Sequence, residues 1–219
     1  MKNISIDQKG RSMIEMLGVL AIVGVLSVAG IAGYSKAMAK YKVNKVTDQV
    51  STLSANIKTL FASVGSYSGL NDTTAKSNQR AYKLGLFPDD MVKTCGKSGA
   101  TYGQAAAATD CIRNGMNGAV GVYGSGNKFT IAMAGLTKEA CTALLTSDWG
   151  GAAGFTAISV DSTNGTKAEL TEIKAADTTC ATSATASYSP ACLSEKGVYA
   201  AAKASCVSAD ANTVIWTFN

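Results

Sequence analysis

The sequence predicts an α+β fold in which a long N-terminal helix packs on an antiparallel β-sheet and disulfides bound the C-terminal part of the sheet. A helical pattern runs through roughly the first third of the chain, and short segments of alternating residues follow it after residue 117. All six cysteines lie in the last 125 residues. The length of 219 residues fits one domain, so the helix and the sheet are expected to share one core.

The segment from Ser12 to Ser35 carries a single charge, at Glu15. At about 1.5 Å per residue the segment spans about 36 Å, which exceeds a hydrocarbon core of roughly 30 Å. Lys2 and Lys9 precede it, and positive charge before an apolar run favours export of the following chain. The segment therefore predicts a membrane helix. A cleaved signal peptide stays open as an alternative, because Ala29-Gly30-Ile31-Ala32 resembles a signal cleavage site.

The helical pattern continues beyond the apolar segment. Seven apolar residues recur at alternating spacings of three and four: Val43, Val46, Val50, Leu53, Ile57, Leu60 and Val64. This spacing predicts an apolar stripe that packs against the rest of the protein. No proline occurs before Pro88, so we expect one helix from Met13 to Val64, about 78 Å long and ended by Gly65-Ser66.

Glu15 is the candidate functional residue of this helix. A carboxylate in an apolar segment costs several kcal/mol unless it is neutral or paired, so a partner is expected. A cut after Gly10 would leave a free α-amine on Arg11, and that amine could pair with Glu15 of a neighbouring copy. Close approach of neighbouring helices is favoured by Gly18, Gly24, Gly30 and Gly33.

The cysteines predict three disulfides in an oxidising compartment. They are Cys95, Cys111, Cys141, Cys180, Cys192 and Cys206, with wide gaps and no C-x-x-C pair, which is unlike a metal site. Fifteen pairings are possible for six cysteines. Cys95 and Cys111 are the only two in residues 66–117, so a local pair is expected there.

Composition argues against several function classes. The chain has no histidine, which removes Ser-His-Asp and Cys-His catalysis and nearly all catalytic zinc sites. It has no phosphate-binding loop and no carboxylates at a useful spacing, and Asp161 and Asp177 do not form a calcium loop. The net charge of +5 is scattered and does not form a basic stripe. We therefore expect no enzymatic activity, no metal, no cofactor and no nucleic-acid partner.

The region after the helix predicts loops and then a sheet. Residues 66–117 are rich in Gly, Ser, Asn and Ala and are expected to be an ordered loop region with short helices. A hairpin is expected from 118–124 and 127–135 around Ser125-Gly126. Further expected elements are a helix at 136–147 capped by Thr137, a strand at 153–160, a turn at Asn164-Gly165, a helix at 195–205 and a strand at 213–218.

Side chains outside these patterns receive plain interpretations. Five aromatic residues are expected in the core: Phe129, Trp149, Phe155, Trp216 and Phe218. Asp89-Asp90 is expected to be a solvated pair, with a salt bridge between subunits as the alternative. The lysines that follow the apolar segment are expected to form a positive collar at the membrane surface: Lys36, Lys40, Lys42 and Lys45.

The N-terminal motif resembles the type IV prepilins. In that family a short basic leader ends in Gly and is cut before an apolar helix with Glu at its fifth position, as in Lys9-Gly10 followed by Arg11-Ser12-Met13-Ile14-Glu15. The resemblance implies cleavage between Gly10 and Arg11 by a prepilin peptidase, usually with methylation of the new terminus. Arg11 departs from the apolar first residue that is usual in the family.

The head resembles the type IVb pilins, the class of toxin-coregulated and bundle-forming pilins. LTKEACTALLTSDWG (136–150) and YAAAKASCVSADANTVIWTFN (199–219) resemble the two segments that carry the cysteines bounding the family's D-region, and YSGL (67–70) and FPDDM (87–91) resemble its loop after the long helix. The resemblance implies a disulfide between Cys141 and Cys206. Cys180 and Cys192 then remain for a local pair, while Cys180–Cys206 with Cys141–Cys192 stays open.

The resemblance implies a domain plan and a function. The plan is a leader (1–10), a transmembrane and assembly half of the helix (11–35), an amphipathic half (36–65) and a head, with a loop region (66–117) and the sheet and D-region (118–219). The implied function is that of a structural subunit that passes from the inner membrane of a Gram-negative bacterium into a surface filament of identical copies through an assembly platform, for adhesion, aggregation or DNA transfer. A minor pilin or a type II secretion pseudopilin is the alternative.

Overall fold

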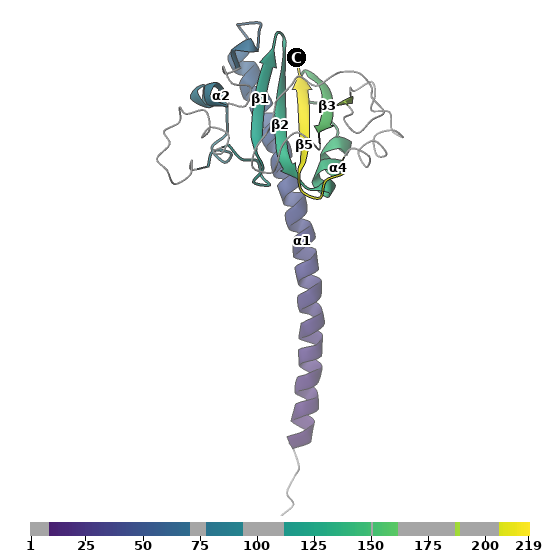
Figure 1. Cartoon of the computed structure of the whole chain (residues 1–219). Coiled ribbons are helices and arrows are strands. Elements are labelled where there is room, and N and C mark those ends of the chain that lie inside the picture. Colours follow the sequence, from purple (N-terminus) through teal and green to yellow (C-terminus); the bar gives the residue numbers. More distant parts are fainter. Residues whose placement is uncertain (1–8, 71–77, 94–111, 150, 162–186, 189–205) are drawn as a thin grey trace, which may run out of the picture. The chain divides into compact units, whose positions relative to one another are not determined.

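A computed structural model describes residues 9–70, 78–93, 112–149, 151–161, 187–188 and 206–219. Figure 1 shows a long helix, α1, and a sheet in which strands from both halves of the sequence lie side by side. The chain divides into two structural units, Met1–Tyr41 and Lys42–Asn219, and the division falls inside α1.

Helix α1 runs from Lys9 to Phe61 without interruption. It therefore begins earlier than the expected Met13 and ends three residues before the expected Val64. The end has a clear local cause: the Val64 N–H donates to the Phe61 carbonyl (3.0 Å), and Gly65 takes a left-handed conformation with φ +68°. Gly65 thus terminates the helix as predicted, but after a turn outside it.

The sheet has five strands in the order β1-β2-β5-β3-β4, and every pairing is antiparallel. Their bounds are β1 Val120–Ser125, β2 Lys128–Leu136, β3 Phe155–Asp161, β4 Ser187–Tyr188 and β5 Asn212–Phe218. The predicted hairpin is confirmed, with Gly126 at φ +55° in its turn. The last strand lies in the middle of the sheet, between β2 and β3, where both of its edges are paired (Figure 1).

Helix α4 (Lys138–Thr146) follows β2 directly. Thr137 caps it as predicted, because its hydroxyl accepts a hydrogen bond from the Ala140 N–H (3.3 Å). Between β2 and this cap, Gly135 has φ +67° and the register of β2 shifts between Met133 and Leu136. The bulge ends the pairing and turns the chain into the helix.

One face of the sheet and the C-terminal half of α1 bury a common core. The helix contributes Val46, Val50, Leu53, Ile57 and Phe61, and the sheet contributes residues that include Phe129, Ile131, Met133, Val214, Trp216 and Phe218. The aromatic rings interlock there, with Phe129 and Phe218 centroids 5.1 Å apart and Trp149 and Trp216 5.3 Å apart. The predicted core aromatics are confirmed, although Phe155 is only half-buried at the margin.

The predicted stripe of α1 is wrong at its C-terminal end. Leu60 and Val64 are 41% and 64% exposed, and Phe61 takes the core position instead. From Ile57 the next residue on the buried face is four positions on, at Phe61, which meets the ring of Tyr67 at 5.8 Å. Val64 lies beyond the end of the helix, where the 3.6-residue period no longer applies.

The loop region contains two short helices, as expected: a 3₁₀ turn, η1 (Ser68–Leu70), and α2 (Gln79–Lys83). Asn78 precedes α2 and is buried against the free edge of β1. Its side-chain amide donates to the Val120 carbonyl (2.6 Å) and accepts from the Val122 N–H (3.2 Å). One side chain thus satisfies two backbone groups that an edge strand would leave unpaired.

Several sequence expectations lie outside the described residues. These are the turn at Asn164-Gly165, the helix at 195–205, and the pairing of Cys95, Cys111, Cys180 and Cys192.

Candidate assembly site and disulfide-bounded region

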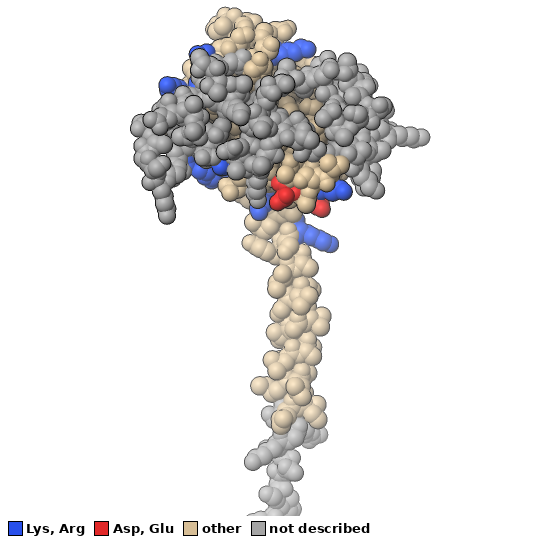
Figure 2. All heavy atoms as spheres, viewed as in Figure 1, with Lys and Arg blue, Asp and Glu red and all other residues tan. Residues whose placement is uncertain are grey.

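The N-terminal half of α1 presents apolar side chains that the described chain leaves uncovered. Every residue from Met13 to Ala37 is exposed, including Ile14 at 73% and Leu26 at 65%. By length and composition this helix is able to cross a membrane. Figure 2 shows several of its turns built from uncharged side chains. A surface this apolar requires lipid or other apolar helices around it.

The hydroxyls within this segment are satisfied by the helix itself. Ser27 donates to the Val23 carbonyl (2.7 Å), and Ser35 donates to the Ile31 carbonyl (3.0 Å). Such bonds to the preceding turn let serine lie in an apolar environment without an outside partner. The segment therefore contains one strongly polar side chain, that of Glu15.

Glu15 lies exposed on the second turn of the described side chains, between apolar neighbours. Within the described residues it forms no salt bridge. No residue lies within 4 Å of a Cβ built on Gly18, Gly24, Gly30 or Gly33, so these glycines leave shallow notches along the helix surface. The helix thus carries an unpaired carboxylate and positions where another helix could approach closely.

The predicted processing residues, Gly10 and Arg11, lie in the first turn of α1. The helical backbone begins at Lys9, so the peptide bond between Gly10 and Arg11 is helical in the uncut chain. Four residues separate Arg11 from Glu15, which places the two on the same side of the helix about one turn apart.

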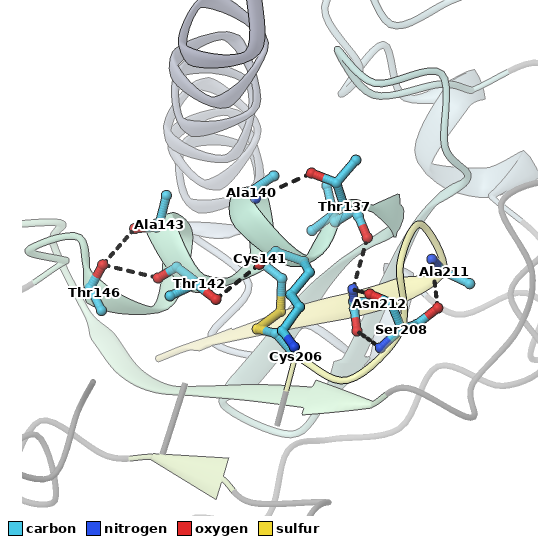
Figure 3. The surroundings of a disulfide bond; sticks show 12 residues. Thr137, Ala140, Cys141, Thr142, Ala143, Thr146, Cys206, Ser208, Ala211 and Asn212 are labelled. Carbon is cyan, nitrogen blue, oxygen red and sulfur yellow. Dashed lines mark hydrogen bonds between the residues drawn. A yellow bond between two sulfur atoms is a disulfide. The ribbon is translucent and has the colours of Figure 1, made fainter. Parts of the chain in front are cut away.

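The disulfide that the resemblance implied, Cys141–Cys206, is present. It joins α4 to the segment before β5, with a Cα–Cα distance of 5.8 Å and a sequence separation of 65 residues. Figure 3 shows the bond leaving the helix toward the loop that enters β5. Both cysteines are fully buried, so the bond is part of the core.

A polar clasp centred on Asn212 supports this disulfide (Figure 3). The Asn212 amide donates to the carbonyls of Leu136 (3.0 Å) and Ser208 (2.7 Å), and its oxygen accepts from the Ser208 N–H (3.0 Å). The Lys138 N–H also donates to the Ala209 carbonyl (3.2 Å). The start of α4 and the chain before β5 are therefore held together twice, by a covalent bond and by buried hydrogen bonds.

The expectation for Asp90 is wrong. Instead of a solvated pair with Asp89, its carboxylate forms a salt bridge with Lys45 (3.3 Å) and accepts a hydrogen bond from the Gln49 amide (2.7 Å). Gln49 also accepts from the Gly115 N–H (2.9 Å). Both ends of the loop region are thereby attached to one turn of α1.

Sequence reasoning missed the buried polar residues of the head. Gln49 was placed on the polar face of α1 but is buried, and Asn78, Asn114 and Asn212 were not singled out. Asn114 donates to the Ala134 carbonyl (2.8 Å) and accepts from the N–H groups of Met116 and Gly118 (both 2.9 Å). One signal was available for Gln49, since it adjoins Val50 and lies one turn from Val46 on the apolar stripe.

Comparison with known proteins identifies this arrangement. The family model described as PilS N terminal matches residues 40–219. The structure is similar to the crystal structure of TcpA, a type IV pilin from Vibrio cholerae El Tor biotype. The TM-score is 0.51 at 20% sequence identity, over 82% of this chain and 99% of that chain. No curated protein matches the chain.

The two comparisons agree with the geometry. The family match covers the whole head and the C-terminal half of α1, and the structural likeness adds the long helix, the antiparallel sheet and the disulfide-bounded region. The chain belongs to the PilS family and has the type IV pilin fold of the toxin-coregulated type.

Proposed function

We propose that this chain is the major structural subunit of a type IVb pilus, a filament of identical copies that acts in adhesion, aggregation or DNA transfer. The observation that carries the proposal is the exposed apolar half of α1, from Met13 to Ala37, in a chain whose head has the fold of a type IV pilin. Such a helix serves first as a membrane anchor and then as the packed centre of a filament. The role of the chain is structural and needs no catalysis.

The proposed life of the subunit follows the order of its segments. A leader of residues 1–10 is removed by a prepilin peptidase between Gly10 and Arg11 while residues 11–35 span the inner membrane. An assembly platform in that membrane then transfers the subunit into the extracellular filament. Residues 36–65 carry the amphipathic half of the helix, and residues 66–219 form the head.

Glu15 is proposed to set the register of assembly. Its exposed carboxylate would pair with the α-amine of Arg11 on a neighbouring copy. Two unit charges about 4 Å apart attract by about 4 kcal/mol at an effective dielectric constant near 20, and an unpaired charge in the same place would be costly. A subunit would therefore join stably only where a neighbouring terminus is available.

The test is Glu15→Ala, with Glu139→Ala as the matched control. Glu139 is an exposed carboxylate in the first turn of α4. We expect Glu15→Ala to enter the membrane but to leave sheared cell-surface material without filaments, while Glu139→Ala assembles normally. Normal filaments from Glu15→Ala would contradict the pairing.

Mass spectrometry of the sheared filaments tests processing and rank. We expect an abundant species that starts at Arg11 and gains six protons on reduction. A species that starts after residue 32 would contradict the anchor and favour a signal peptide. A correctly processed but scarce species would identify a minor pilin.

A further inference from the structure

Glu15 and Lys36 mark the two ends of an uncharged stretch of α1. The 20 residues from Met16 to Ser35 contain no charged side chain, and the backbone is helical throughout. At about 1.5 Å per residue, Glu15 and Lys36 are about 32 Å apart along the axis, close to the roughly 30 Å of a bilayer core. When Lys36 lies at one surface of the membrane, Glu15 therefore lies at the other.

The residues around Lys36 have the character of a membrane surface anchor. Lys36 and Lys40 are exposed and one helical turn apart, and Tyr34 and Tyr41 beside them are 67% and 60% exposed. Tyrosine favours the boundary between lipid and water, and lysine extends its ammonium toward the headgroups. Four such side chains within eight residues make a compact collar.

The charge of this collar is not balanced by the chain nearby. No Asp or Glu occurs between Glu15 and Asp48. Among the described residues, the one salt bridge joins Lys45 and Asp90, so neither collar lysine has an acidic partner there. The collar is thus a local excess of positive charge that an anionic partner would complement.

The position of the lysines also opposes export of the head. Positive residues favour the side of the membrane from which the chain starts, yet Lys36 and Lys40 follow the apolar segment. A favourable contact on the far side is needed to offset this. Anionic phospholipid headgroups in that leaflet supply such a contact at the place where the two lysines emerge.

We propose that Lys36 and Lys40, with Tyr34 and Tyr41, bind anionic phospholipid headgroups and so fix the depth of α1, keeping Glu15 at the opposite membrane surface until assembly. The proposal rests on the membrane stage of the proposed function. It changes the role of Glu15 before assembly, because at the surface its carboxylate stays hydrated. Water is removed from it only when the subunit enters the filament.

The first experiment measures lipid selectivity of the full chain in phosphatidylcholine vesicles with and without phosphatidylglycerol. Spin-labelled forms of both lipids report which one lies next to the protein. The variant Lys36→Gln/Lys40→Gln is compared with Lys83→Gln/Lys93→Gln, which removes two exposed lysines from the head. We expect the parent chain and the control to prefer phosphatidylglycerol, and the collar variant to lose up to about 30-fold of that preference at low salt. The preference should also fall as salt is added.

The other outcomes each have a meaning. An unchanged preference in the collar variant overturns the proposal, and if that variant also fails to form filaments, the lysines pair with acidic groups of a neighbouring copy. Insertion of the parent chain without any preference overturns the collar alone. Failure of the parent chain to insert overturns both the collar and the membrane stage of the proposed function.

The second experiment tests the depth of Glu15. Glu15→Gln should insert as well as the parent chain, because a surface carboxylate does not oppose insertion. Val19→Glu places a carboxylate one turn deeper and should lower the alkali-resistant membrane fraction several-fold. A several-fold gain for Glu15→Gln would place Glu15 in the hydrocarbon and overturn this part of the proposal.

Discussion

The two halves of α1 use apolar residues in opposite ways. From Met13 to Ala37 every side chain is exposed, whereas Val46, Val50, Leu53 and Ile57 are completely buried against the sheet. The helix backbone is continuous between them. The difference therefore lies in what the side chains meet, and it divides one helix into a part stabilised within the chain and a part that needs outside partners.

This division separates folding from assembly. The head contains its own core, its disulfide and its buried hydrogen bonds, all among residues after Lys42. The N-terminal half contributes nothing to that core. Changes in the head should therefore act on stability, and changes in the N-terminal half should act on insertion and assembly, with little exchange between the two.

Removal of the disulfide tests the head most severely. In the chain-entropy model, closing a loop of this length stabilises by about 4 kcal/mol, and the double variant Cys141→Ala/Cys206→Ala should lose about that much. Urea unfolding followed by fluorescence of the buried Trp149 and Trp216 measures the loss. Membrane insertion should be unchanged. A loss below about 1 kcal/mol would show that the Asn212 clasp suffices to hold this part of the head.

A pair of leucine variants compares the two halves directly. Leu53→Ala empties a fully buried site and should lower the free energy of unfolding of the head by about 2–5 kcal/mol. Leu20 is 63% exposed, so Leu20→Ala should change that free energy by less than about 0.5 kcal/mol. The same urea titration measures both. Equal losses would contradict the division of the helix.

The sequence predicted the elements that depend on pattern. The alternating segments became β1, β2, β3 and β5, and Thr137 became a helix cap, because neighbouring residues decide these features. The exchange of Leu60 for Phe61 escaped prediction because it depends on where the chain turns toward Tyr67. The site at Glu15 was found from sequence for the opposite reason, since a lone charge in an apolar run is visible without any contact.

Buried polar residues were missed because their partners are distant in sequence. Gln49 bonds to Asp90 and Gly115, which lie 41 and 66 residues away. Asn78 pairs with β1 backbone more than 40 residues later. An amide on a helix or loop has no local signal for such a role, because its burial follows from how the loops fold back.

The network at Gln49 contrasts a buried polar contact with an exposed one. Gln49→Ala leaves the Gly115 N–H without its partner and should destabilise the head by about 1–3 kcal/mol. Asp90→Asn keeps an acceptor for Gln49 and removes only the charge facing Lys45, and both of these side chains are over 30% exposed. It should therefore cost at most about 1 kcal/mol. Asp89→Asn is the control for the loss of charge alone, and the urea midpoint is the measurement. A larger loss for Asp90→Asn than for Gln49→Ala would contradict this ranking.

The smallest effect concerns Lys58, at the C-terminal end of the buried stripe. Its ammonium donates to the Ala153 carbonyl and lies 5.8 Å from the centre of the Phe218 ring. Partial burial lowers the pKa of this ammonium below the usual 10.5. The folded state then releases the proton at a lower pH than the unfolded state, so the contribution of Lys58 to stability rises as the pH increases through the folded pKa toward 10.5. Lys58→Met should flatten that rise in unfolding titrations between about pH 8 and about pH 10, whereas Lys83→Met, at an exposed site, should leave the slope of the parent chain. Equal slopes for Lys58→Met and the parent chain would show that the ammonium stays fully hydrated at the surface of the head.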